Sequence, residues 1–103
     1  MEFIETPLFS KIRESYFGDI EFHMLQLHLI DRPDAGDLIV GTGGATKLRW
    51  GIGGRGKRGG VRVIYYWITK DHQILLITVY AKNEASDISP ATKKAIKKMI
   101  GEL

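Results

Sequence analysis

Five residues with cationic or phenolic side chains recur at a spacing that could place them together on a β-sheet. The first pair is Lys47 and Arg49, and the last pair is Tyr80 and Lys82; each pair is separated by one residue. Arg62 lies between the pairs, near the start of an apolar run. Alternate residues of a strand point to the same face. The spacing therefore predicts one surface that carries all five, and these are our candidate catalytic residues.

These groups suit the cleavage of an RNA chain through its own 2′-hydroxyl. That reaction needs a base at the hydroxyl, charge stabilisation at the phosphorus oxygens and an acid at the leaving 5′ oxygen. A lysine surrounded by cations has its charged form disfavoured and can act as a base, whereas an arginine stays charged and grips a phosphate through two hydrogen bonds. We therefore expect neither a metal ion nor an organic cofactor.

Charge is unevenly distributed along the 103 residues. Residues 1–37 contain eight acidic and three basic side chains, whereas residues 38–103 contain twelve basic and four acidic ones. No acid occurs between Leu38 and Lys70. Such a positive region attracts polyanions, so nucleic acid is the expected ligand.

A glycine-rich basic segment, residues 51–60, lies inside this positive region. It matches the dinucleotide-binding pattern G-x-G-x-x-G and most of a P-loop, but both patterns need a helix directly after the glycines. A β-rich run follows here, so we expect no nucleotide cofactor. The interpretation we favour is a loop that contacts phosphates of RNA or the ribosome through Arg55, Lys57 and Arg58; the alternative is a solvated hairpin tip.

Histidines, carboxylates and cysteines offer little for catalysis. His23, His28 and His72 match no metal-site spacing, and we expect them to be surface or packing residues. Few acids closely follow a predicted strand, and one of these, Asp87, is expected to cap or orient the turn into the last helix. Cysteine is absent, which excludes disulfides, thiolate zinc sites and a cysteine nucleophile.

Length and hydropathy limit the architecture and the location. A chain of 103 residues suggests a single domain over residues 1–103. The acidic N-terminus lacks the features of a signal peptide, and no apolar stretch approaches the roughly 20 residues of a membrane span. We therefore expect a cytoplasmic protein with no membrane partner.

Caps and periodicity predict three helices. Thr6-Pro7 begins the first, which Gly18 could end in a left-handed conformation. Asp19 could cap the second, which Pro33 stops. Ser89-Pro90 begins a terminal amphipathic helix, and we expect its lysines to form a solvated face. The second helix is expected to have one broad apolar face formed by Ile20, Met24, Leu25, Leu27 and Leu29.

Strands are predicted at residues 1–5, 47–50, 61–69 and 74–81 from alternation or from β-branched and aromatic content. Residues 70–73 form a polar turn, so the last two strands make an antiparallel hairpin. This order favours an α+β fold: a small antiparallel sheet with an N-terminal helical hairpin and a C-terminal helix, all packed on one face. The other face would be free.

The register of the hairpin decides whether Arg62 joins Tyr80. A two-residue turn at residues 71–72 would set Arg62 opposite Ala81, on the face away from Tyr80, whereas a three-residue loop at residues 70–72 would set Arg62 opposite Tyr80. We predict the three-residue loop or an equivalent bulge.

The same segments resemble the HigB branch of the RelE toxin superfamily, over essentially the whole chain. The resemblance lies in residues 47–49, 56–60 and 62–66, and most specifically in Tyr80-Ala81-Lys82-Asn83-Glu84 followed by Asp87 and Ser89-Pro90. It implies a compact RelE-like (microbial-ribonuclease-like) α+β fold. It further implies a toxin that cleaves mRNA in the ribosomal A site without a metal ion.

The resemblance also implies a cognate antitoxin, often a HigA-like helix-turn-helix protein, whose complex with the toxin represses its own promoter DNA. It assigns catalysis to positions that correspond to Lys47, Arg49, Arg62, Tyr80 and Lys82, and leaves open whether Tyr80 or Lys82 is the acid. Two alternatives remain at this point: a gyrase poison of the ParE kind, which shares the fold, and a non-catalytic RNA-binding module.

Overall fold

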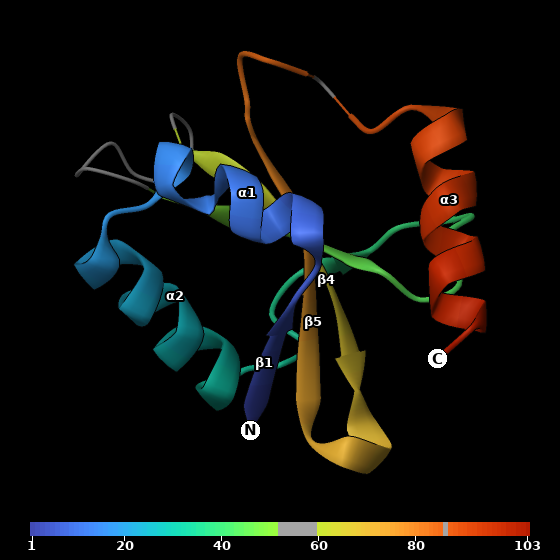
Figure 1. Cartoon of the computed structure of the whole chain (residues 1–103), viewed down its shortest axis with the longest axis horizontal. Helices are drawn as coiled ribbons and strands as arrows, with labels where there is room; N and C mark the ends of the chain where they lie inside the picture. Colours follow the sequence, from blue (N-terminus) through green and yellow to red (C-terminus); the bar gives the residue numbers. More distant parts are fainter. Residues whose placement is uncertain (52–59, 86) are drawn as a thin grey trace.

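A five-stranded sheet lies at the centre of the fold (Figure 1). The computed structural model describes residues 1–51, 60–85 and 87–103. The strands are β1 (Glu2–Glu5), β2 (Asp37–Leu38), β3 (Thr46–Trp50), β4 (Val61–Ile68) and β5 (Gln73–Ala81), ordered β1-β5-β4-β3-β2 across the sheet. The helices are α1 (Pro7–Tyr16), α2 (Asp19–Asp31) and α3 (Pro90–Gly101), so the α+β prediction is confirmed.

The sheet is mixed, which differs from the antiparallel sheet predicted. Strands β2 to β5 pair antiparallel, but β1 runs parallel to β5. Thr6, directly after β1, donates its N–H to the carbonyl of Leu76 (3.0 Å) and its hydroxyl to the carbonyl of Ile77 (2.7 Å). These bonds hold β1 along the outer edge of β5. Strand β1 has four residues, too few for a sequence pattern that would reveal its direction. Strand β2 was not predicted, because it lies in a segment expected to be a loop.

Both cap-plus-proline signatures begin helices, as predicted. Oγ1 of Thr6 accepts a hydrogen bond from the N–H of Phe9 (3.1 Å), and Oγ of Ser89 accepts one from the N–H of Thr92 (3.2 Å). Each side chain therefore satisfies a backbone donor that a helix leaves free in its first turn.

The turn between α1 and α2 differs from the expectation. Phe17 ends α1, and Gly18 precedes α2 with φ −74°, so Gly18 is not a left-handed cap. Its N–H instead donates to the carboxylate of Glu21 (3.2 Å). Asp19 is accordingly the first residue of α2 rather than its cap.

The β4–β5 hairpin has the predicted register, and a bulge produces it. The loop at the tip spans residues 69–72 rather than 70–72. Midway along the hairpin, a one-residue shift in the pairing leaves Ile77 as an extra residue of β5. Beyond this bulge Arg62 lies opposite Tyr80.

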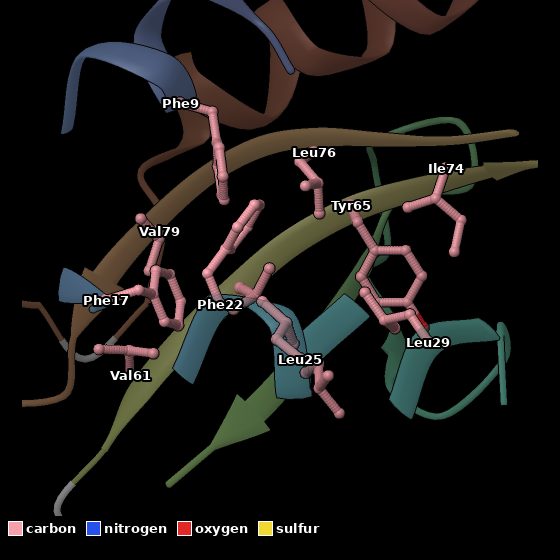
Figure 2. Close-up of a cluster of buried hydrophobic side chains, with 12 residues drawn as sticks. Phe9, Phe17, Phe22, Leu25, Leu29, Val61, Tyr65, Ile74, Leu76 and Val79 are labelled. Carbon is pink, nitrogen blue, oxygen red and sulfur yellow. The ribbon is translucent and has the colours of Figure 1, made fainter. Parts of the chain in front are cut away.

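Helices cover both faces of the sheet, so the prediction of a single covered face is wrong. On the first face α1 and α2 enclose the larger core, in which Phe17 packs beside Phe22 and Leu29 beside Tyr65 (Figure 2). On the second face Ile96 of α3 is buried in a smaller core. Figure 1 shows α2 and α3 on opposite sides of the sheet. The second core forms because the apolar stripe of α3 also has to leave water.

From the sequence, the apolar residues of α2 were expected to form one broad face, but the structure divides them between two faces. Its buried residues are Phe22, Leu25 and Leu29, whereas Ile20, Met24 and Leu27 are exposed. The helix therefore has two apolar faces, and only one of them meets the sheet.

Thr6→Val should lower the free energy of unfolding by about 1–3 kcal/mol, because it removes the cap of α1 and leaves the buried Ile77 carbonyl without its hydroxyl donor. Urea denaturation followed by circular dichroism measures the change. Ser10→Ala is the matched control: Ser10 bonds to Glu5 in an exposed position, so the change should stay within about 0.5 kcal/mol. Equal losses in the two variants would contradict this role for Thr6.

Candidate active site

Four of the five predicted catalytic residues lie on one face of the sheet. Arg49 of β3 lies opposite Arg62 of β4, and Arg62 lies opposite Tyr80 of β5. Directly opposed residues point to the same face, with Cβ atoms about 5 Å apart. Lys47 is two residues before Arg49 on β3 and shares its face. We refer to Lys47, Arg49, Arg62 and Tyr80 as the polar row.

The two arginines of the polar row keep their guanidinium groups available. Arg49 is exposed and Arg62 is half-buried. Within the described part of the chain, neither forms an ion pair with a carboxylate. Arg62 makes one long hydrogen bond, from Nη1 to the carbonyl of Val61 (3.5 Å). Two adjacent arginines without acidic partners can bind a dianionic or bridging phosphate.

Asp87 brings a carboxylate to the polar row. Its Oδ1 lies 3.8 Å from Nζ of Lys47 and its Oδ2 lies 3.8 Å from Nζ of Lys93. Oδ1 also accepts a hydrogen bond from the N–H of Ile88 (2.8 Å). This bond, followed by the charges of the two lysines, lowers the pKa of Asp87 against the opposing effect of burial. Asp87 is thus ionised at neutral pH.

Sequence reasoning assigned Asp87 only to the helix turn and missed its ion pairs. The available signal was that Asp87 is an acid placed shortly after the strand that carries Tyr80. Lys93 was expected to be solvated with the other lysines of α3, yet it is half-buried against Asp87. Lys94, Lys97 and Lys98 are exposed, as predicted.

The phenol of Tyr80 is enclosed by the protein rather than open to solvent. Its hydroxyl is buried and has no hydrogen-bond partner among the residues that the structure describes. Burial raises the pKa of Tyr80, the charge of Asp87 raises it further, and the charge of Arg62 opposes both. The group stays protonated at neutral pH. It borders a mainly apolar hollow of about 610 Å³ between α1, β5 and α3.

The fifth predicted catalytic residue, Lys82, lies beyond the end of β5. Strand β5 ends at Ala81, and the exposed Lys82 begins a turn that the N–H of Glu84 closes on the carbonyl of Ala81 (3.0 Å). Lys82 therefore follows the polar row rather than belonging to it. The predicted RNA- or ribosome-binding residues Arg55, Lys57 and Arg58 lie outside the described residues.

The three histidines are surface or packing residues, as predicted. His72 adopts a left-handed conformation (φ 52°) at the hairpin tip, at the far end of β4 from Arg62. His28 packs against Trp50 with ring centroids 5.2 Å apart, and His23 is exposed. Across the described residues, no three His, Asp or Glu side chains are grouped so as to hold a metal ion.

Glu84 ties the segment after β5 to α1. Its Oε1 accepts hydrogen bonds from the hydroxyl of Tyr16 (2.5 Å) and from the N–H of Ala81 (2.7 Å). The bond to Glu84 is the main reason that the pKa of Tyr16 rises to about 12. The same bond is the main reason that the pKa of Glu84 falls. This contact joins residues far apart in the chain, and sequence reasoning gave no sign of it.

A family model described as the RelE toxin of the RelE/RelB toxin-antitoxin system matches residues 34–103, more than half of the chain. The chain belongs to the RelE toxin family. It is therefore a toxin of a toxin-antitoxin system, with an antitoxin as its partner, and its α+β architecture is consistent with a RelE-like fold. The matched region of this RelE-family toxin contains the whole polar row and Asp87. None of the helices in the described part is long and apolar enough to cross a membrane.

Tyr16→Phe should raise the pKa of Glu84 toward its ordinary value of 4.5, because it removes the bond that lowers this pKa most. A carboxyl with a lowered folded-state pKa stabilises the fold above its ordinary pKa and loses that contribution as the pH falls through the folded-state value. The variant should therefore lose less stability than the wild type as the pH falls below the ordinary pKa of 4.5.

A side-chain NMR titration of Glu84 and urea denaturation across this range measure both effects of the Tyr16 substitution. Tyr66→Phe serves as the control, since Tyr66 packs against the second core and should not alter the titration of Glu84. An unchanged Glu84 titration in Tyr16→Phe would show that the bond is not made in solution.

Proposed function

We propose that this RelE-family toxin is a ribosome-dependent mRNA endonuclease of the HigB branch, which inhibits translation in the cytoplasm. The observation that supports this most is the polar row, where two unpaired arginines and a protonated phenol lie side by side on neighbouring strands. A phosphodiester could contact both arginines directly, and it would reach the buried phenol of Tyr80 once that side chain turns outward. The family match supports a toxin, and the row supplies the groups that RNA cleavage requires.

In the proposed reaction the arginines bind the scissile phosphate. Arg62, at the centre of the row, contacts the non-bridging oxygens, and Arg49 beside it shares the charge that builds up as the phosphorus becomes five-coordinate. Guanidinium groups held by strands lose little freedom when the phosphate binds, so more of their interaction energy stabilises the transition state.

The two proton transfers fall to the two ends of the polar row. The 2′-hydroxyl oxygen attacks phosphorus and its proton passes to the carboxylate of Asp87, which the protonated Lys47 holds beside the row. As the bond from phosphorus to the 5′ oxygen breaks, Tyr80 gives that oxygen its proton, which leaves a 2′,3′-cyclic phosphate and a 5′-hydroxyl. Tyr80 is favoured over Lys82 as the acid because it belongs to the row, directly opposite Arg62, whereas Lys82 lies beyond the strand end. No metal ion enters this scheme.

The ribosome is expected to orient the message. The polar row lies on the surface of a sheet and includes the exposed Arg49, so it offers little to position a free RNA. We assign Lys82 and the loop residues Arg55, Lys57 and Arg58 to contacts with RNA or ribosomal phosphates. The HigB assignment rests on the motif Tyr80-x-Lys82-Asn83-Glu84-x-x-Asp87, and it implies a HigA-like antitoxin whose complex with the toxin binds promoter DNA.

Induced expression of the toxin without its antitoxin should stop protein synthesis before DNA synthesis. Pulse-labelling with an amino acid and with thymidine after induction measures the order of the two effects. Arrest of DNA synthesis while translation continues would favour a gyrase poison and overturn the proposal.

Arg62→Ala should reduce cleavage of mRNA on translating ribosomes by about 10³-fold, because it removes the central phosphate contact. Lys47→Ala and Tyr80→Phe should reduce it by about 10- to 100-fold. All three should fold and bind the antitoxin almost normally, because Arg62 and Lys47 add little to the apolar cores and Tyr80→Phe keeps the ring that packs against the second core. Primer extension on purified translating ribosomes, with and without EDTA, gives the rates.

His72→Ala is the matched control for these variants and should cleave at the wild-type rate, since His72 lies at the hairpin tip. Inactivity of His72→Ala together with activity of Arg62→Ala would move the site to the other end of the hairpin. EDTA-sensitive cleavage of bare transcripts would contradict both the ribosome dependence and the metal-free scheme.

A further inference from the structure

The outward face of α2 is an apolar stripe that no residue described by the structure covers. Ile20, Met24 and Leu27 follow one another at the spacing of a helix face and are 78%, 57% and 51% exposed. Ile30, next to the stripe, is 48% exposed. We refer to these four residues as the α2 stripe. A single exposed apolar residue is ordinary, but a contiguous row on one helix is typical of a binding surface.

The α2 stripe is not needed to hold α2 in place. The helix already buries Phe22, Leu25 and Leu29 on the opposite side, against the first core (Figure 2). A helix that is apolar on both sides is normally buried on both sides. Since α2 packs only its inner side against the described part of the chain, its outer side is suited to a second molecule.

The charges around the α2 stripe are acidic. Helix α2 contains Asp19, Glu21 and Asp31 but no lysine or arginine, and Arg32 directly follows it. Asp19 and Asp31 are exposed at the two ends of the stripe. A ligand for this surface therefore needs apolar side chains at its centre and basic side chains at its flanks.

We propose that the α2 stripe is the docking surface for an amphipathic helix of the antitoxin, with apolar anchors along its centre and lysine or arginine beside them. Apolar residues at i, i+4 and i+7 are the pattern by which one helix packs along another. The 13 residues of α2 give a surface about 20 Å long, enough for three turns of a partner helix. The proposal rests on the toxin-antitoxin membership and not on the proposed cleavage reaction.

The same charges argue against other occupants. In a twofold pair of toxins that face each other through the α2 stripes, Asp19 and Asp31 of each copy would have only Arg32 of the other α2 end as a basic partner, so two acids would share one cation. Nucleic acids and anionic lipid surfaces would also be repelled by the acidic ends. A basic protein segment is the partner that satisfies both the apolar and the charged parts of the surface.

Docking at the α2 stripe would leave the polar row uncovered. Helix α2 packs on the face of the sheet that carries Val63 and Tyr65, whereas Arg62 points to the opposite face. The bound antitoxin segment would then neutralise the toxin by adding bulk that prevents entry into the ribosome, rather than by covering the catalytic groups.

The proposal can be tested with the purified toxin and its purified cognate antitoxin in titration calorimetry. Leu27→Arg, which puts a cation into the centre of the surface, should weaken binding by at least about tenfold. Leu38→Arg is the matched control, because Leu38 is also exposed but lies on β2; it should bind within about twofold of the wild type. Met24→Gln, a milder change that favours helix formation, should weaken binding in the same direction.

Salt dependence and Asp31→Asn test the charged part of the proposal. Wild-type binding should weaken as the salt concentration rises, and Asp31→Asn should reduce both the affinity and this salt dependence. Binding that is independent of salt and of Asp31 would overturn the assignment of a basic partner segment.

Co-expression separates this proposal from the proposed function. Leu27→Arg should arrest growth and cleave mRNA like the wild type when expressed alone, but the co-expressed antitoxin should no longer neutralise it. Full neutralisation of a folded Leu27→Arg, or wild-type affinity in both Leu27→Arg and Met24→Gln, would overturn the docking site. A dimer of the toxin alone that Leu27→Arg dissociates, seen by light scattering, would assign the stripe to a second copy. Failure of the wild type to cleave RNA would leave the binding results standing.

Discussion

The bulge at Ile77 determines which side chains share a face between the two longest strands. If the β4–β5 pairing at the hairpin tip continued without the extra residue, Arg62 would lie opposite Val79, which belongs to the first core. The bulge sets Arg62 opposite Tyr80 instead. Thr6 donates hydrogen bonds to the carbonyl of Ile77, the extra residue, and to that of Leu76 before it. A residue near the N-terminus thus supports the alignment of groups more than fifty residues away.

The candidate site is built on strands whose other faces are in the core. Val61 and Val63, on either side of Arg62, are buried in the first core, so the backbone that carries Arg62 has little freedom. Leu48, between Lys47 and Arg49, is buried in the same way. Groups held by packed strands keep their relative positions better than groups on loops, which is what binding a single phosphate requires.

The segment after β5 completes the electrostatics of the polar row. In the free toxin, the carboxylate of Asp87 partly neutralises the charges of Lys47 and Lys93, whereas the two arginines of the row have no acidic partner among the described residues. An RNA phosphate that enters the row would compete with Asp87 for Lys47. Glu84 anchors the same segment through Tyr16 of α1, so the position of the acid depends on contacts with the helical hairpin. The α2 stripe lies on the opposite side of the sheet, which separates the surface proposed for the antitoxin from the groups proposed for catalysis.

The local elements and the four residues of the polar row could be predicted from the sequence alone, although the prediction wrongly placed Lys82 on the same face. Thr6-Pro7 and Ser89-Pro90 define helix starts through bonds within one turn, and alternation along single strands predicts the pairs that share a face, because these signals depend only on near neighbours. Three features could not be predicted: the direction of β1, the packing of α3 on the second face, and the division of α2 into a buried and an exposed apolar face. Each depends on which surfaces come into contact when the chain folds. Asp87 shows the same limit. Its place after the strand could be seen in the sequence, but its pairing with Lys47 and Lys93 was decided only when the sheet and α3 came together.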